Sequence, residues 1–505
     1  MDSKSYLKNS MPSKFCLTLV ALSLILSACG SGQEVQFVAS EGEQYRPDYH
    51  FTPAKGWMND PNGMFFLDGE YHLFFQHYPD TTVWGPMHWG HAVSRDLVTW
   101  EELPIAIYPD SLGYIFSGSA VVDTENSSGL GTAENPPIVA IFTYHDMAGE
   151  KSGAVDFQSQ GIAFSTDKGR TWTKFEGNPV LPNQGVRDFR DPKVSQVVNS
   201  EGKKEWVMTL AAQDRVQFYS SPDLKSWSKT GEFGQDTGAH GGVWECPDLI
   251  KMSTPDGKEK WVLLLSINPG GPQKGSATQY FIGDFKDGSF TPDDNMIRWL
   301  DYGPDNYAGV TWANLPQSDS RTLFIGWMSN WLYAQVVPTQ SWRSAMTVPR
   351  ELSLIDVNGV LLLKSAPAQE LESLRQAGIE IDQTSNLPSQ AVEIEGKLDG
   401  SDTFSLVLSN ELGEKVTITK EMGLVSIDRS QAGQSDFHGD FAAMHSAPMS
   451  WKAESVRIFL DAGSVELFVN DGELVMTSLL FPNSPWKTVE LQQGIEDGVV
   501  YPLEK

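Results

Sequence analysis

The stretch SRDLVTW at Ser94–Trp100 recurs in two altered copies, STDKGRTW at Ser165–Trp172 and SPDLKSW at Ser221–Trp227. Each copy begins with Ser-x-Asp and ends with Trp. This pattern is typical of a turn whose aspartate caps its own backbone, followed by a tryptophan that packs on the sheet. The copies recur at intervals of roughly 55 to 70 residues, which predicts one copy in each four-stranded blade of a β-propeller. Three imperfect copies alone also leave a large β-sandwich open.

The composition around these turns is that of an all-β protein. The 505 residues include 45 glycines and 29 prolines, enough to supply a turn after every short strand. Between them lie short apolar or alternating runs such as GEYHLFFQH, PPIVAIFTY and KWVLLLS. Such runs, bounded by Gly, Asp, Asn and Pro, predict strands. We therefore place a propeller over residues 45–352.

The pattern changes after TVPREL, Thr347–Leu352. Residues 353–375 are expected to form a linker with a helical stretch, because Leu371 and Leu374 are spaced for one face. Beyond them, strand-like runs are joined at Asp-Ala-Gly, from Asp461, and Asn-Asp-Gly, from Asn470. These are hairpin signals. They predict a second domain, a β-sandwich, over residues 376–505.

The N-terminus has the pattern of an export signal over residues 1–28. Three lysines precede an apolar stretch, Phe15–Leu26, that is too short to span a bilayer comfortably. Leu26-Ser27-Ala28-Cys29 follows and resembles the signal of bacterial lipoproteins, in which the cysteine becomes the lipidated first residue. An ordinary secretory signal that contains a cysteine is the alternative. We expect an exported lipoprotein, anchored through Cys29 on a periplasmic or cell-surface face, with residues 29–44 as a flexible tether.

The net charge and the remaining motifs limit the classes of ligand, metal and cofactor that this protein is expected to bind. A formal net charge of −28 argues against nucleic acids and anionic surfaces, so a neutral partner is expected. His88 and His91, with His77 nearby, alternate along a predicted strand without an acidic third ligand, so we expect no metal. Gly270-Gly271 lacks the context of a phosphate-binding loop, and no cofactor is expected. The sequence leaves the oligomeric state open.

Three acids lie close to prolines in strand-like segments. Asp60 occurs in WMNDPNG, Asp191 in FRDP and Glu245 in WECPDL. Proline has no N–H for a ladder and therefore favours a sheet edge, such as the innermost strand of a propeller blade. We expect the three acids to converge on one funnel, with a turn over Asn59–Gly63 aiming Asp60 into it. The alternative for each acid alone is a solvated turn.

Two carboxyl groups on either side of a bond are what glycoside cleavage requires. The segments WMNDPNG, FRDP and WECPDL resemble the hallmark motifs of glycoside hydrolase family 32, the invertases, inulinases and levanases. YIFSGSAV, GWMSNWLYA and VRIFLDAGSVELFVNDGE also resemble segments of this family. The resemblance runs from about residue 46 to 505 in order and implies a five-bladed propeller followed by a β-sandwich.

The resemblance also implies roles for individual residues. Asp60 would be the nucleophile, Glu245 the acid/base, and Asp191, beside Arg190, a group that steadies the transition state. The residues expected to bind substrate are Trp57, Met58, Asn59, Gln76, Trp84, Phe116, Ser117, Arg190 and Trp331. Retaining chemistry would place the carboxyl groups of Asp60 and Glu245 about 5–5.5 Å apart. Cys246 is expected to pack beside the acid, and not to act as a nucleophile.

The implied activity is the removal of terminal β-D-fructofuranosyl units from levan, inulin or sucrose. A fructosyltransferase would share the motifs, and a non-catalytic glycan-binding lipoprotein would share the fold. The segment WMSNWLYA is closer in character to exo-levanases and exo-inulinases, which favours polymer ends. The linkage that is cleaved stays open.

Overall fold

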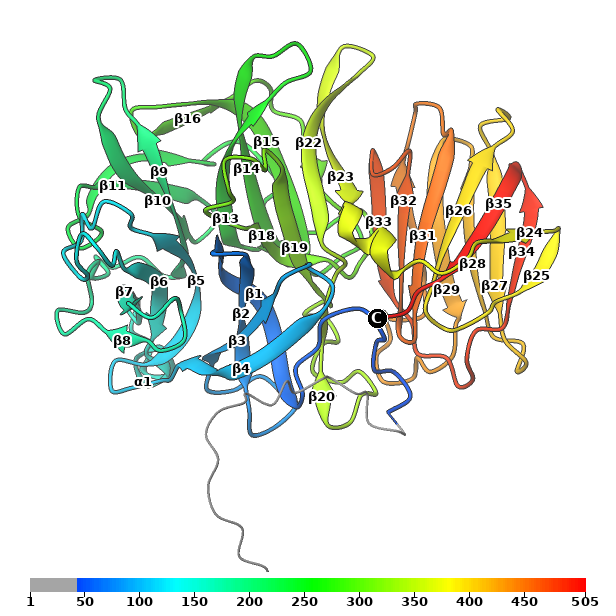
Figure 1. Ribbon diagram of the computed structural model, residues 1–505, viewed down its shortest axis with the longest axis horizontal. Coiled ribbons are helices and arrows are strands. Elements are labelled where there is room, and N and C mark those ends of the chain that lie inside the picture. The colour runs from blue at the N-terminus through cyan, green and yellow to red at the C-terminus, as the bar shows by residue number, and fades with distance from the viewer. Residues whose placement is uncertain (1–42) are drawn as a thin grey trace, which may run out of the picture. The chain divides into compact units, whose positions relative to one another are not determined.

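The computed structural model describes residues 43–505 (Figure 1). Cys29, the expected signal and most of the expected tether lie outside the described residues. Within the described part, helix is confined to α1 (Met147–Ser152) and the 3₁₀-helix η1 (Gln369–Leu374). No helix in this part has the length and apolar character that a membrane span needs. The rest of the regular structure is strand, as the composition predicts.

Five sheets form the blades of a propeller (Figure 1). The first contains β1 (Gly56–Leu67), β2 (Glu70–Tyr78), β3 (His88–Ser94) and β4 (Trp100–Ile107), with β20 (Trp342–Arg343) beside β1. The second contains β5 (Tyr114–Val122), β6 (Ile138–His145), β7 (Gln158–Ser165) and β8 (Thr173–Lys174). The third contains β9 (Phe189–Val198), β10 (Lys204–Ala212), β11 (Val216–Ser221) and β12 (Ser228–Phe233).

The fourth sheet contains β13 (Val243–Ser253), β14 (Glu259–Asn268), β15 (Ala277–Lys286) and β16 (Ser289–Pro292), with β17 (Arg298–Trp299) beside β15. The fifth contains β18 (Tyr307–Thr311), β19 (Thr322–Met328), β22 (Arg350–Val357) and β23 (Val360–Pro367), with β21 (Ala345–Met346) beside β19. The innermost strands β1, β5, β9, β13 and β18 contact one another in that order, and β18 contacts β1, which closes the ring.

The repeated turn joins the third and fourth strands of the first three blades, as predicted. Asp96 Oδ1 accepts hydrogen bonds from the backbone N–H groups of Val98 and Thr99 (3.0 and 2.7 Å). Asp167 and Asp223 cap their turns in the same manner. The three terminal tryptophans donate their indole N–H to a backbone carbonyl three residues earlier: Trp100, Trp172 and Trp227. The cap therefore explains why this short motif recurs once in each of the first three blades.

Each innermost strand carries a β-bulge at the same level of the ring. In β1, Met58 pairs with His77 but Pro61 pairs with Phe75, so β1 has one extra residue. Strands β5, β9, β13 and β18 each have one extra residue in the same way, relative to the second strand of their blade. The extra residues fall at Asn59-Asp60, Phe116-Ser117, Asp191-Pro192, Cys246-Pro247 and Ala308-Gly309. A bulge re-aims the side chains at its level.

These bulges correct one expectation. Asn59–Gly63 does not reverse the chain but lies within the continuous strand β1. The turn-favouring residues produce two bulges, the second between Asn62 and Phe65, where Gly63 adopts a φ of 52°. A Cβ on Gly63 would lie 2.5 Å from the Trp89 ring, so the close packing requires glycine.

The predicted end of the propeller at residue 352 is also wrong. It falls inside β22, and β22 and β23 complete the fifth blade as far as Pro367. Leu352, Leu354 and Leu363 are buried against the fourth blade, which makes these strands part of the propeller core. The true connection is η1, where Leu371 and Leu374 are buried as the spacing predicts.

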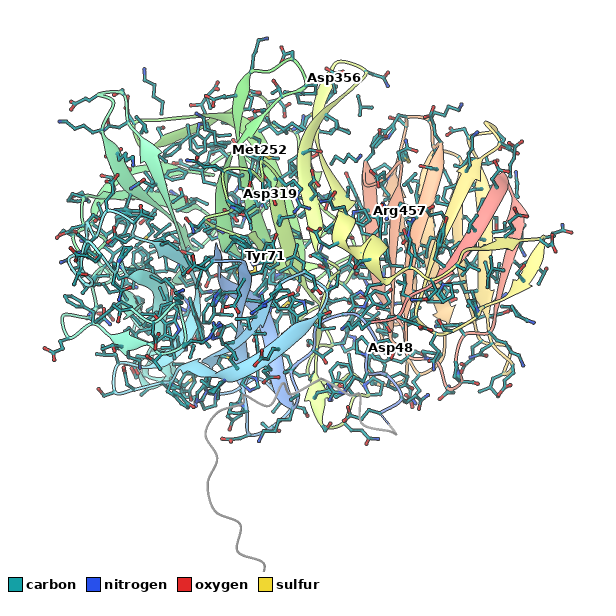
Figure 2. The ribbon with its side chains drawn as sticks, viewed as in Figure 1. Asp48, Tyr71, Met252, Asp319, Asp356 and Arg457 are labelled. Carbon is teal, nitrogen blue, oxygen red and sulfur yellow. The ribbon has the colours of Figure 1, made fainter. Side chains whose placement is uncertain are left out.

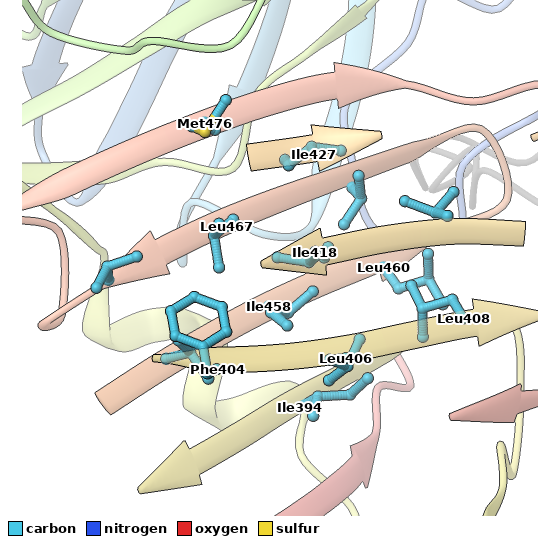
Figure 3. Close-up of a cluster of buried hydrophobic side chains, with 14 of the residues drawn as sticks. Ile394, Phe404, Leu406, Leu408, Ile418, Ile427, Ile458, Leu460, Leu467 and Met476 are labelled. Carbon is cyan, nitrogen blue, oxygen red and sulfur yellow. The ribbon is translucent and has the colours of Figure 1, made fainter. Parts of the chain in front are cut away.

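The C-terminal domain is a sandwich of two six-stranded sheets. One sheet contains, in order, β24 (Ile379–Ile381), β35 (Ile495–Pro502), β26 (Val392–Leu398), β31 (Ser455–Asp461), β32 (Ser464–Val469) and β33 (Leu474–Leu479). The other contains β25 (Thr384–Asn386), β34 (Thr488–Gln493), β27 (Phe404–Ser409), β28 (Lys415–Glu421), β29 (Leu424–Gln431) and β30 (Met444–Pro448). Their inner faces meet in one aliphatic core that includes Ile394, Leu406, Ile418, Ile458 and Leu467 (Figure 3). The hairpins predicted after Asp461 and Asn470 join β31 to β32 and β32 to β33.

One carboxylate of the sandwich holds both ends of the propeller. Glu466 lies 2.9 Å from His50 Nε2, ahead of the first strand, and accepts hydrogen bonds from Val348 N (2.8 Å) and Arg350 Nη2 (2.5 Å), next to the last two strands. Asp48, which is labelled in Figure 2, donates its backbone N–H to Asp461 Oδ1 of the sandwich (2.8 Å). The side chains of His50, Arg350 and Glu466 are fully buried. We call His50, Val348, Arg350 and Glu466 the ring clasp.

Candidate active site

A cavity of about 240 Å³ opens at the level of the five bulges. Ten of the residues expected at the site line it: Asn59, Asp60, Gln76, Trp84, Phe116, Ser117, Arg190, Asp191, Glu245 and Trp331. They come from blades one to four and from the segment after β19. The predicted convergence of the three acids on one funnel is therefore what the structure shows.

Asp60 is held by two side-chain donors. Ser117 Oγ donates to Asp60 Oδ2 (2.6 Å), and Asn59 Nδ2 donates to Asp60 Oδ1 (2.9 Å). Burial raises the pKa of Asp60 and the charge of Glu245 raises it further, while the two hydrogen bonds act in the opposite direction. The donors thus favour an ionised carboxylate whose orientation is fixed.

Glu245 is held by a different set of donors. Arg190 donates through Nε and Nη2 to Glu245 Oε1 (3.1 and 3.0 Å), and Tyr307 donates its hydroxyl to Glu245 Oε2. Arg190 also donates to Asp188 Oδ1 (2.9 Å). These donors stabilise negative charge on Glu245 and fix the plane of its carboxyl group.

Asp191 belongs to the same cluster of acids. Its Oδ2 accepts the backbone N–H of Cys246 (3.0 Å), and its own N–H donates to Thr143 Oγ1 (3.0 Å). Burial raises the pKa of Asp191 to about 7; the Arg190 guanidinium opposes this, and the charges of Glu245 and Asp60 add to it. The ionised form of Asp191 is therefore disfavoured by its burial and by the two neighbouring carboxyl groups.

Cys246 separates two of these acids. Its Sγ lies 3.6 Å from Asp60 Oδ2 and 3.7 Å from Asp191 Oδ2. Burial raises the pKa of this thiol well above its usual range, and the neighbouring carboxylates add to the effect. A thiol in this environment stays protonated, so it is a packing group and weak donor rather than a nucleophile.

Trp57 and Met58 do not line the cavity, contrary to the expectation. Both are fully buried behind it. Trp57 donates its indole N–H to Asn59 Oδ1 (2.7 Å) and stacks on Trp331, with ring centroids 5.8 Å apart. Trp57 therefore supports two residues that line the cavity, Asn59 and Trp331, and does not line it itself.

One wall of the cavity was not predicted from the sequence. It is formed by His145, Glu150, Phe157, Gln158 and Asp188, from the β6–β7 connection and the start of β9. The motifs contain none of the first four, and Asp188 precedes FRDP by two residues. Tyr307, the partner of Glu245, was missed as well. The neighbouring segment Asp305–Thr311 carries no pattern that would have singled it out.

Taken together, these groups define the class of protein. Within residues 43–505, no set of three or more His, Cys, Asp and Glu side chains is arranged to bind a metal ion. The cavity instead brings two separately held carboxyl groups, Asp60 and Glu245, to one small space, with Asp191 and Arg190 beside them. This arrangement of carboxyl groups is typical of the active site of a glycoside hydrolase.

Two family models match the chain: the glycosyl hydrolases family 32 N-terminal domain over residues 50–365, and the C-terminal domain over residues 364–500. The protein belongs to glycosyl hydrolases family 32.

Curated relatives include a levanase of Bacillus subtilis (strain 168), 45% identical over 492 residues that cover 92% of this chain and 71% of the levanase. An extracellular exo-inulinase of Aspergillus awamori is 36% identical over 499 residues, covering 89% and 92% of the two chains. The crystal structure of exo-inulinase from Aspergillus awamori matches with a TM-score of 0.83 and 33% identity, covering 93% of this chain and 100% of that one.

Proposed function

We propose that this protein is an exo-acting β-fructosidase that hydrolyses terminal, non-reducing β-D-fructofuranosyl units of fructans and of sucrose. The observation that carries the proposal is the small cavity that Asp60 and Glu245 both line. Its volume of about 240 Å³ is below the roughly 300–1,000 Å³ of pockets for drug-sized ligands, and it suits one sugar unit. A cavity of this size is consistent with binding of one terminal unit.

In the first step, an oxygen of the Asp60 carboxylate forms a bond to the anomeric carbon of the fructosyl unit. The bond from that carbon to the glycosidic oxygen breaks, and its electron pair stays with the oxygen, which takes the proton of Glu245. Ser117 and Asn59 orient Asp60 for this attack. Arg190 and Tyr307 stabilise the charge that appears on Glu245 when it loses its proton.

In the second step, the Glu245 carboxylate takes a proton from water. The water oxygen attacks the same carbon, and the ester bond to Asp60 breaks. Fructose leaves with its configuration retained, and both carboxyl groups return to their starting state. Asp191, which cannot reach solvent freely, binds sugar hydroxyls and steadies the positive charge of the transition state.

The cavity wall suits a sugar ring. Gln76 lines the cavity, and its amide is fixed by a hydrogen bond from Nε2 to Asn62 Oδ1 (2.8 Å). Trp84 packs edge-on against Phe116, and Trp331 is backed by Trp57. Aromatic faces cover C–H groups, while amides and hydroxyls bind the sugar hydroxyls.

Polymer ends are the substrate that we favour. The B. subtilis relative is named a levanase, and the A. awamori relative an extracellular exo-inulinase. Sucrose is included because an invertase of Schizosaccharomyces pombe is 38% identical over 487 residues.

Product analysis tests the proposal. The purified enzyme is incubated with levan, inulin and sucrose, and products are separated by chromatography over time. Free fructose from the first time points, without intermediate oligomers, is the expected result. Longer oligomers would indicate a transferase, and binding without turnover would indicate a glycan receptor; either outcome would contradict the proposal.

Two controls connect the products to the site. Asp60→Asn should fold and bind sugar but lower turnover by orders of magnitude, because an amide cannot form the fructosyl ester. With methanol present, retention predicts methyl β-D-fructofuranoside as a second product, and the α-anomer would exclude the two-step route.

We also propose that the enzyme is anchored to a membrane by a lipid on Cys29. The signal pattern ending in Leu26-Ser27-Ala28-Cys29 supports this location. Several acyl chains on one cysteine suffice for stable anchoring, since each buried CH₂ contributes about 0.8 kcal/mol. Cys29→Ala should release the enzyme from the membrane fraction or block processing. A soluble wild-type protein with a different mature N-terminus would refute the anchor.

A further inference from the structure

His145, at the end of β6, has one ring nitrogen committed to the protein. Its Nδ1 lies 3.1 Å from Gln158 Nε2. Gln158 Oε1 accepts the backbone N–H of Phe189 (2.8 Å), which fixes the amide and makes Nε2 the donor. His145 Nδ1 is therefore the acceptor, and the ring proton of the neutral imidazole is on Nε2.

The imidazole stays neutral at the pH of a working enzyme. Burial lowers the pKa of His145 to about 4, and the charge of Arg190 lowers it in the same direction. The nearby charges of Asp146 and Asp188 act the other way without reversing the result. One N–H, on Nε2, is thus available at neutral pH.

This N–H has no properly aligned hydrogen-bond acceptor, although the residue is only 3% exposed and lines the cavity. Glu150 Oε2, on α1, lies 3.1 Å from Nε2 but out of line for a hydrogen bond. Glu150 also faces Arg187 at 3.5 Å on the outer side of the wall. A donor and an anionic acceptor therefore stand side by side at the cavity, each with unused capacity.

We propose that His145 and Glu150 together bind a hydroxyl group of the sugar unit that leaves, next to the fructosyl unit under attack. A hydroxyl can accept the Nε2–H of His145 and donate its own proton to Glu150, so it satisfies both groups at once. This inference rests on the proposed function.

The position of the pair indicates the leaving side of the substrate. Gln158 lies between His145 and Arg190, with its Oε1 3.5 Å from Arg190 Nη1, and Arg190 binds the proposed acid Glu245. His145 also stacks flat on Phe116, with ring centroids 4.2 Å apart. The pair therefore lies between the wall of the fructosyl pocket and the wall beside Glu245. Because Glu245 gives its proton to the leaving sugar, this position is next to the leaving sugar.

Kinetics with two leaving groups test this pair. Sucrose has a leaving sugar with hydroxyl groups, whereas methyl β-D-fructofuranoside has the same fructosyl unit and leaves as methanol. Glu150→Gln keeps the size of the side chain and removes its charge. We expect the ratio of kcat/KM for sucrose to kcat/KM for the methyl glycoside to fall about tenfold or more, the loss expected for a hydrogen bond to a charged group.

The matched control is Glu176→Gln. Glu176 is an exposed acid of the same blade, and it does not line the cavity. This variant should keep the wild-type ratio. Glu150→Ala and circular dichroism guard against a folding defect, because Glu150 is partly exposed and its loss should not unfold α1.

Equal losses on both substrates would overturn the inference, since they would mean that Glu150 supports the wall or the fructosyl pocket. Wild-type kcat/KM values on both substrates would overturn it as well. In both cases fructose release by the wild type would leave the proposed function standing. A wild-type enzyme that releases fructose from neither substrate would refute the proposed function, and this inference with it.

Discussion

Replacing Glu466 by glutamine would remove the buried negative charge of the ring clasp. His50 and Arg350 would each keep a single acidic partner, Asp461 and Asp301 respectively. Breaking a buried ion pair by removing one member costs about 3–5 kcal/mol, because the remaining charge stays buried. We expect the free energy of unfolding to fall by that amount at pH 7.

The titration of His50 gives a second measure of the same network. Burial opposes its charged form, but Asp461 and Glu466 outweigh burial and raise its pKa from 6.5 to about 9. This difference corresponds to about 3 kcal/mol of stability. The contribution is fully present below pH 6.5 and is lost as the pH rises through about 9. In Glu466→Gln this alkaline loss should be smaller and should begin at a lower pH.

Urea titrations followed by tryptophan fluorescence, at pH 6, 7.5 and 9.5, would measure both effects. Asp440→Asn is the control, since it removes an exposed ion pair with Lys274 and should leave the stability close to that of the wild type. A loss below about 1 kcal/mol in Glu466→Gln, or stability curves of variant and wild type that run parallel from pH 6 to 9.5, would refute the reasoning.

Three further predictions concern the cavity. Ser117→Ala should lower kcat/KM about tenfold or more and move its acidic limb to higher pH, because the lost hydrogen bond favours the ionised form of Asp60; an unmoved limb would contradict this. Tyr307→Phe should slow substrates with poor leaving groups more than aryl fructosides, since it weakens the support of Glu245; equal slowing would contradict this role. Asp191→Asn should become more stable relative to the wild type as the pH rises from about 4 to 7, because the raised pKa makes ionisation of the buried acid unfavourable; parallel thermal-denaturation profiles would count against it.

The sequence predicts the parts of the site that are encoded locally. The capped turns at Asp96, Asp167 and Asp223 depend on residues within each turn, so a repeat search finds them. The prolines after Asp60 and Asp191 indicate edge strands, which is why the acids could be placed on the inner ring.

The features that were not predicted depend on contacts between residues that are distant in sequence. A bulge exists only relative to the strand beside it, so WMNDPNG alone is equally compatible with a turn. His145 and Tyr307 carry no motif; their roles follow from Gln158 and Glu245, which the fold brings to them. The end of the fifth blade was missed because β22 and β23 belong to it by the pairing of β22 with β19 and by their packing on the fourth blade. Their residue pattern does not show this.

Because of the five bulges, a change of one residue in the length of an inner strand would alter the catalytic site. Successive side chains of a strand point to opposite faces, so a shift of one residue exchanges the faces. Deleting one residue at the level of Asp60, Asp191 or Glu245 would let the ladder close without a bulge and turn the acid from the funnel into the blade. The blade would keep its pairing and most of its core. One lost codon therefore separates a catalytic propeller of this design from an inert one, and insertions or deletions here should inactivate relatives without changing their fold.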